Sequence, residues 1–249
     1  MGETRKSVYQ RICQLPTVFD HRDVELAFNW DHDQAKQFCV RAVEQGVAAR
    51  AGERAGIYYN LFLEPKGRAV LLGDVLRRIN PSVVMVGLSA LHAASWITQN
   101  PRLLEVAMPR TRVVRSYPKI DGAVIVTRSL GWFSDVASSL SPADDQSNIF
   151  GLRSIGPEAA VADLLANVGN LPLMSGRMAR DLQKVDPDAL EPIEPICPIT
   201  LQSWMRLLGV SDDVAAPYLA RANATKNITT IGPEGEFVWG DDDNIGPGV

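Results

Sequence analysis

The sequence has little of what stabilises secreted domains or carries metal chemistry. It contains 3 cysteines and 3 histidines in 249 residues. Cys13, Cys39 and Cys197 are isolated from one another, and no CxxC pair is present. Scattered cysteines in odd number provide neither the paired spacing of a zinc module nor a disulfide framework. We therefore expect reduced thiols, no bound metal and a cytoplasmic location.

Long apolar runs and glycine-rich phosphate loops are also missing. The longest apolar stretch, residues 83–88 with Gly87 inside it, is far short of the ~20 residues that a membrane span requires. The GPEGE segment at residues 232–236 lacks the Lys-Ser/Thr pair of a P-loop. These absences argue against a membrane partner and against P-loop chemistry, and they leave no cofactor to expect.

Charge is distributed unevenly along the chain, whose formal net charge is −4. Residues 181–249 carry 4 basic and 12 acidic side chains, whereas residues 1–180 carry 21 and 17. Without its acidic end the chain is mildly basic. This balance suits a DNA contact that is confined to one surface.

Three amphipathic helical patterns and a β-prone run occupy the first 65 residues. The helical patterns cover residues 6–15, 21–30 and 34–46. Asp20 and either Asp31 or Asp33 are the expected N-caps, and Gly46 is the expected left-handed residue after the third helix. Residues 57–63 favour a strand of a hairpin. Three short helices followed by a hairpin predict a winged helix-turn-helix.

The rest of the chain mixes helical and strand patterns, which predicts an α+β protein. Helices are expected at residues 71–80, 83–98 (with Ser82 as cap), 157–168, 201–210 and 216–223. Strands are expected at residues 103–108, 111–117, 123–128 and 148–155. Composition then suggests three regions: a winged helix-turn-helix over 1–68, a mixed α/β domain over 69–185, and a proline-rich linker with helices and an acidic tail over 186–249.

Polar side chains on the third helix are the candidate DNA contacts. Its apolar set, which includes Phe38, Cys39 and Val43, is expected to be buried together. Four side chains must then project outward: Gln34, Lys36, Gln37 and Arg41. Glutamine amides can read adenine, and cationic side chains reach guanine edges or phosphates.

The hairpin adds two further cationic candidates. Arg50 and Arg54 fall on the predicted wing, where they would neutralise phosphates. Two alternatives remain open for the whole set. The polar face of the helix could simply be solvated, or the winged helix could bind a protein or an effector without touching DNA.

Three segments resemble one known family when their order and spacing are considered together. They are the helix-Gly-hairpin that ends in GIYYNLF, the segment GLSALHAASWITQNPRLLEVAMPR, and the segment GLRSIGPEAAVADLLANV. Together they span roughly residues 5–170. In this order they resemble the AbiEi-type antitoxins and related antitoxin-like regulators, in which an N-terminal winged helix precedes an α/β antitoxin domain.

The resemblance implies a function as well as a fold. It implies a DNA-binding antitoxin of a type IV toxin-antitoxin system, which represses its own promoter and opposes a nucleotidyltransferase-like toxin. In that family the opposition is thought not to require a stable toxin complex. The partners to expect are therefore double-stranded DNA and, functionally, a cognate toxin. The acidic region after Asp186 has no counterpart in this resemblance.

Two constellations of reactive side chains have simpler explanations than catalysis. Ser89, His92 and Asp163 have the residue types of a hydrolase triad, but no GxSxG elbow surrounds the serine. His21 and His32 lie among aspartates that could suggest a metal site, but carboxylates also favour helix N-termini. We expect no enzyme activity, no catalytic residue and no metal ligand.

Overall fold

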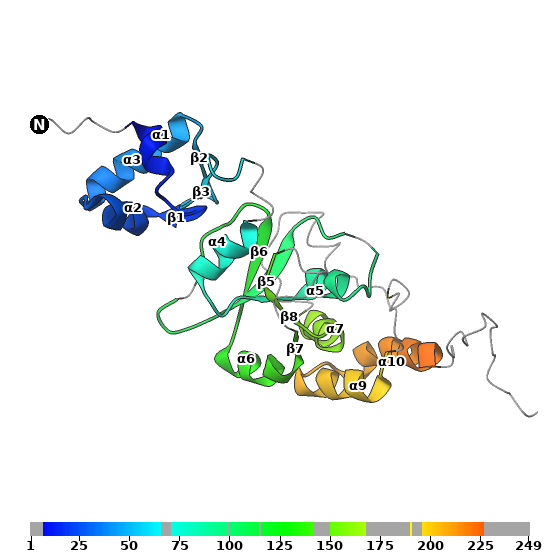
Figure 1. Cartoon of the computed structure of the whole chain (residues 1–249). Coiled ribbons are helices and arrows are strands. Elements are labelled where there is room, and N and C mark those ends of the chain that lie inside the picture. Colours follow the sequence, from blue (N-terminus) through cyan, green and yellow to red (C-terminus); the bar gives the residue numbers. More distant parts are fainter. Residues whose placement is uncertain are drawn as a thin grey trace, which may run out of the picture. The chain divides into compact units, whose positions relative to one another are not determined.

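The structure, a computed structural model, combines helices and sheets, which confirms the predicted α+β class (Figure 1). It describes residues 7–65, 71–98, 100–114, 116–141, 150–167, 190 and 196–226. The chain forms two compact units, which consist of Met1–Ser89 with Pro101–Ile155 and of Ala90–Asn100 with Gly156–Val249. Among the helices in the described ranges, none has both the length and the apolar character to cross a membrane.

The first 65 residues contain the expected three helices and hairpin. In chain order the elements are α1 (Val8–Ile12), β1 (Val18–Asp20), α2 (His21–Phe28), α3 (His32–Glu44), β2 (Ala48–Arg50) and β3 (Ile57–Asn60). The three strands form an antiparallel sheet in the order β1-β3-β2. Strand β1 was not indicated by the sequence pattern, because three residues are too few to show alternation.

The helices and the sheet enclose one apolar core. Phe38 and Cys39 are buried as predicted, whereas Val43 is partly buried and packs against the core from its edge. Burial raises the pKa of the Cys39 thiol to about 12. The side chain of Asn60 is also buried, and its amide nitrogen donates to the carbonyl oxygens of Ile12 at 2.9 Å and Leu15 at 3.2 Å. These bonds hold the end of α1 against β3.

Capping residues set the helix ends that position the polar face of α3. Asp20 caps α2 and Asp31 caps α3, and both helices begin with a complete capping box. Gly46 has φ +70°. Its N–H donates a hydrogen bond to the Val43 carbonyl, and the N–H of Val47 donates one to the Ala42 carbonyl at 3.0 Å. This pair of bonds is a Schellman motif, so the predicted left-handed end at Gly46 is confirmed.

A five-stranded mixed sheet follows in the same unit. Its strands are β4 (Val84–Met85), β5 (Leu104–Pro109), β6 (Ala123–Arg128), β7 (Leu140–Ser141) and β8 (Arg153–Ile155), in the order β6-β5-β4-β8-β7. The pairs β5–β6 and β4–β8 are parallel, and the other two are antiparallel. Helices α4 (Leu72–Ile79) and α6 (Leu130–Val136) belong to this part of the chain.

Two local expectations for this region are corrected, and one helix was not expected. Residues 83–98 do not form one helix capped by Ser82, because Val84 and Met85 form β4 and the helix α5 (Gly87–Ala93) begins only afterwards. Residues 111–114 form a turn instead of a strand, closed by the N–H of Thr111 on the Val114 carbonyl at 3.2 Å. Helix α6 was missed, although Ser129 supplies an ordinary N-cap to Trp132.

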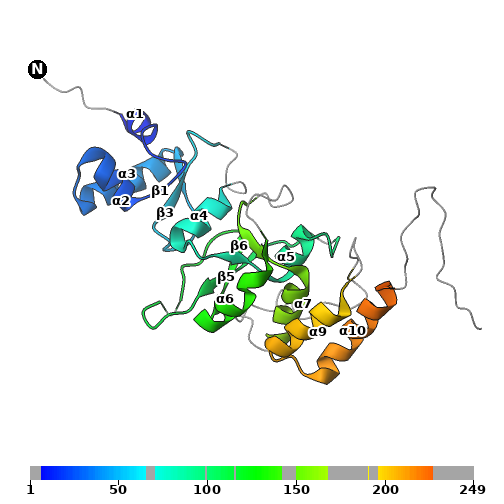
Figure 2. The same cartoon turned by 60° about the horizontal axis from the view of Figure 1, so that its bottom comes forward.

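The second unit is helical in its described part. Helix α7 (Pro157–Ala166) begins with Pro157 in its first turn, as expected, and packs against α9 (Pro198–Leu207). Helix α9 in turn packs along α10 (Asp212–Lys226), an arrangement visible in Figure 2. The acidic residues Asp241 to Asp243 lie outside the described residues.

Candidate nucleic-acid interface

Helix α3 presents exposed polar side chains beside its buried apolar set. Gln34, Gln37 and Arg41 are all exposed, and their spacing of three and four residues places them on one face. The guanidinium of Arg41 lies 3.5 Å from the side-chain oxygen of Gln37. Asp33 and Glu44, near the two ends of the helix, are exposed as well. The glutamine- and arginine-bearing face is therefore bounded by carboxylates at both ends.

This face forms one wall of a groove between α3 and α1. The groove has a volume of about 340 Å³ and is lined by Val8, Arg11, Trp30, Gln34, Gln37, Phe38 and Arg41. Three of the predicted DNA contacts thus share one concave surface. The groove is also lined by Arg11 and Trp30, which were not among the predicted site residues. They come from α1 and from the segment before α3.

Arg11 and Trp30 form a stacked pair inside the groove. The guanidinium carbon of Arg11 lies 4.7 Å from the centre of the Trp30 ring. The indole also contacts Phe28, at 4.9 Å between ring centres, and Phe38, at 5.8 Å. An aromatic face attracts a guanidinium by a cation–π interaction. The head group of Arg11 is therefore restrained at the groove, while its charge stays available.

Lys36 is exposed but lies on a different side of α3 from the other three predicted contacts. Residues two apart on a helix do not share a face, so Lys36 is turned away from Gln34. Lys36 instead acts on His21, whose pKa is lowered by burial first and then by the nearby His32 and Lys36. The structure does not bring Lys36 together with the groove residues.

The hairpin carries Arg50 at the end of β2 and Arg54 in the turn, and both are exposed as predicted. Arg54 has φ +58°, a left-handed conformation that is unusual for a residue with a side chain. The turn also contacts a later segment, because the N–H of Asp121 donates to the Ala51 carbonyl at 2.9 Å. A Cβ at Gly52 would lie 2.0 Å from the Lys119 carbonyl oxygen, so this close approach requires glycine.

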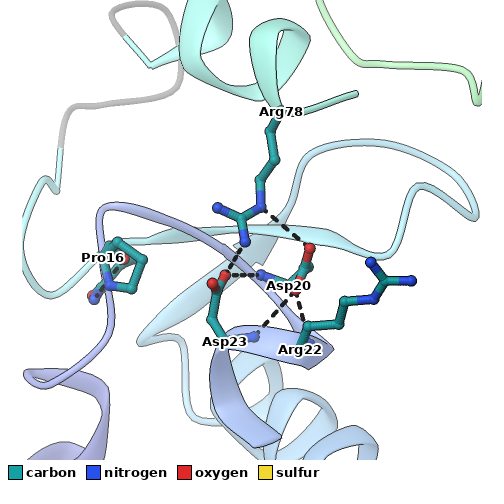
Figure 3. Close-up of polar contacts among 6 residues, drawn as sticks. Pro16, Asp20, Arg22, Asp23 and Arg78 are labelled. Carbon is teal, nitrogen blue, oxygen red and sulfur yellow. Dashed lines mark hydrogen bonds and ion pairs between the residues drawn. The ribbon is translucent and has the colours of Figure 1, made fainter. Parts of the chain in front are cut away.

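An ion-pair cluster joins α4 to the start of α2 (Figure 3). The Arg78 guanidinium donates from Nε to Asp20 Oδ2 at 3.2 Å, and its Nη2 donates to Asp23 Oδ2. Both carboxylates also form the capping box of α2, where Asp20 accepts from the N–H of Arg22 at 2.8 Å. Arg78 thereby links α4 to the helix that precedes α3. Sequence patterns did not indicate this contact.

The constellations considered for catalysis or metal binding have structural partners. Ser89 Oγ accepts from the N–H of Glu105 at 2.9 Å and donates to the Leu103 carbonyl at 3.4 Å, which ties α5 to β5. His32 Nδ1 lies 2.7 Å from Glu25 Oε1. Within the described ranges, no group of three or more His, Cys, Asp or Glu side chains is arranged to hold a metal ion.

Comparisons with known proteins include a likeness to a solved structure. No family model matches the chain, and no curated protein matches it. The chain is similar to the crystal structure of the RV2827C protein from Mycobacterium tuberculosis, with 15% identity, coverage of 86% of this chain and 79% of that chain, and a TM-score of 0.44. A likeness at that TM-score carries no argument about function, which has to be inferred from the site itself.

Proposed function

We propose that residues 7–65 form a winged helix-turn-helix that binds duplex DNA, and that the protein is an antitoxin-like autoregulator of its own promoter. The observation that carries the DNA-binding part is the face of α3. Gln34, Gln37 and Arg41 are exposed on it, while Ala35, Cys39 and Ala42 of the same helix are buried in the core. A helix that presents amides and a cation in this way matches the chemistry of major-groove readout.

The hairpin supports the same proposal. Strands β2 and β3 follow α3 directly, and the exposed Arg50 and Arg54 lie on the hairpin that they form. Two cations on a wing would neutralise phosphates beside the groove that α3 reads. The rival proposal, a winged helix that acts only on proteins, would be favoured by burial of the polar α3 side chains. Gln34, Lys36, Gln37 and Arg41 are all exposed.

The antitoxin part of the proposal has a different support. It rests on the resemblance of the three sequence segments to the AbiEi-type antitoxins. It predicts that the protein lowers expression from its own promoter and relieves the growth defect caused by a nucleotidyltransferase-like toxin encoded beside it. A reporter fusion to the promoter tests the first statement. Co-expression with the product of the adjacent gene tests the second.

Base contacts and phosphate contacts should separate in one binding experiment. Gln37→Ala should cost about 1–3 kcal/mol on the promoter duplex and reduce the preference over random duplex, as expected for one lost base contact. Arg54→Ala should weaken binding to both duplexes alike and reduce the salt slope by about one. Alanine carries the same Cβ as arginine, so this change leaves the left-handed backbone cost at residue 54 in place. Gel shifts across a salt series measure both effects.

Arg206→Ala serves as the matched control, because Arg206 is an exposed arginine in the last turn of α9. This variant should bind as the wild type does. A wild-type protein with equal affinity for its promoter and for random duplex at moderate salt would exclude the autoregulator. In that case the rival proposal, a winged helix that acts only on proteins, would replace the autoregulator proposal.

A further inference from the structure

The groove between α1 and α3 brings two guanidinium groups together. Arg11 and Arg41 both line it, one from each helix. In the part of the chain that the structure describes, neither guanidinium forms an ion pair with a carboxylate. The groove lining contains no acidic residue among those same residues. A concave site with two cations and no anion is complementary to an anionic ligand.

The donor groups in the groove favour a phosphate as the anionic ligand. Guanidinium groups bind phosphate oxygens through paired, charge-assisted hydrogen bonds. The stacking of Arg11 on Trp30 restrains the guanidinium before any ligand arrives. Restraint of this kind reduces the rotamer entropy that binding would otherwise cost.

The position of the groove identifies the source of the phosphate. Its α3 wall is the face that carries Gln34, Gln37 and Arg41, and its other wall includes Arg11 of α1. A duplex read by the α3 face would therefore run its backbone past α1. We infer that the groove binds a phosphate of the DNA backbone, held jointly by Arg11 and Arg41, and that Trp30 positions Arg11 for this contact. The inference rests on the proposed DNA-binding function and adds α1 to the interface. It also assigns Arg41 to the backbone instead of to a base.

The test measures salt slopes for the full chain on promoter duplex and on random duplex. Arg11→Ala should weaken binding on both duplexes but reduce the salt slope by less than one, because Arg41 still neutralises the shared phosphate. Only the double variant Arg11→Ala with Arg41→Ala should reduce the slope by about one and weaken binding roughly tenfold near 0.1 M salt. Arg11→Lys should keep the slope, because it keeps the charge. The double variant Arg11→Ala with Arg41→Ala should lose less affinity than the two single losses predict, since both arginines hold one phosphate.

Trp30 needs a readout that separates positioning from folding. Trp30→Leu should weaken binding without changing the salt slope, because both arginines keep their charges. Trp30→Phe, which retains an aromatic face, should recover most of the affinity. Equal losses in Trp30→Leu and Trp30→Phe, with normal unfolding curves for both, would overturn the positioning role.

The remaining outcomes distinguish this inference from the proposed function. If wild type prefers its promoter but Arg11→Ala binds both duplexes as the wild type does, the groove assignment is wrong and the DNA-binding proposal survives. If wild type binds neither duplex, both fail. Inorganic phosphate, added at matched ionic strength, should not compete selectively. If it displaces DNA from wild type but not from Arg11→Ala, the groove takes free phosphate and the backbone assignment is overturned.

Discussion

His21 shows how a single side chain can couple the stability of the N-terminal part to pH. Its ring lies edge-on to Tyr58, with 5.5 Å between ring centres, and to His32, with 5.7 Å. Burial lowers the pKa of His21 below its ordinary value of 6.5, and His32 and Lys36 lower it further against the opposing effects of Asp20 and Glu25. The folded state therefore disfavours the protonated ring.

The sign of the effect follows from linkage. Because the folded pKa lies below the unfolded one, the unfolded chain binds more protons between the two values, and stability falls as pH drops from 6.5 toward the folded pKa. We expect His21→Gln to remove this part of the pH dependence. Urea unfolding of wild type and variant at pH 7.5, 6.5 and 5.5 measures it. A stability difference between the two proteins that stays constant with pH would contradict the expectation.

At the scale of elements, the end of α3 depends on backbone conformation more than on contacts. Gly46 has φ +70°, and an added Cβ there would meet no atom within 4 Å. Gly46→Ala should therefore destabilise the protein by about 1–2 kcal/mol through the left-handed conformation alone. Chemical denaturation gives the value.

Gly131 offers a control of opposite sign. It lies inside α6, and a Cβ there would meet Ser129 Oγ at an ordinary 3.7 Å. Gly131→Ala should stabilise the protein by about 0.5–1 kcal/mol, because alanine loses less backbone entropy in a helix. Destabilisation by both substitutions would show that the two sites are limited by packing instead of by backbone conformation.

The sequence predicted helices and strands correctly where the apolar periodicity covers several turns. The predictions were wrong where the periodicity is short. The thirteen residues of α3 carry several turns of apolar spacing, so the helix and its exposed residues were predictable, while its cap was left between Asp31 and Asp33. The run at residues 83–86 is apolar throughout, and such a run does not distinguish a buried strand from a buried helix. Residues 111–117 have β-prone side chains, but Val113 is 91% exposed and Thr111 closes a turn.

At the scale of the whole molecule, the Arg78 cluster joins parts of the chain that are remote in sequence. Arg78 and the two carboxylates that it bridges are each about one quarter to one third exposed, with side-chain values of 30%, 27% and 23% for Arg78, Asp20 and Asp23. Partial burial of this kind reduces solvent screening relative to a surface pair. The cluster therefore contributes to holding α2 in its capped state.

Removal of this arginine should loosen α2 selectively. We expect Arg78→Ala to reduce local stability by about 1 kcal/mol, which corresponds to roughly fivefold faster amide exchange at the start of α2. Arg77→Ala is the control, because Arg77 pairs with Asp74 and the Gly151 carbonyl instead. Hydrogen exchange by mass spectrometry over residues 20–28 compares them. Equal acceleration in both variants would mean that α4 as a whole, and not the ion pair, is responsible.

The site residues that were not predicted are those that only tertiary packing brings together. Gln34, Gln37 and Arg41 could be found because one helix alone decides which way they face. Arg11 and Trp30 become neighbours only when α1 packs against the loop before α3, and no local periodicity encodes that contact. Arg78 meets α2 across 58 and 55 residues of sequence, at Asp20 and Asp23. Polar tertiary contacts of this range leave no pattern in a single sequence.

The buried thiol of Cys39 makes it possible to measure how often the N-terminal core opens. Cys13 and Cys197 are exposed, so an alkylating reagent reaches them at once, whereas Cys39 is fully enclosed and its pKa of about 12 keeps it in the unreactive thiol form. Modification of Cys39 must wait until the core opens. The slow phase of thiol labelling therefore measures how often the core around Cys39 opens, in the unmodified sequence.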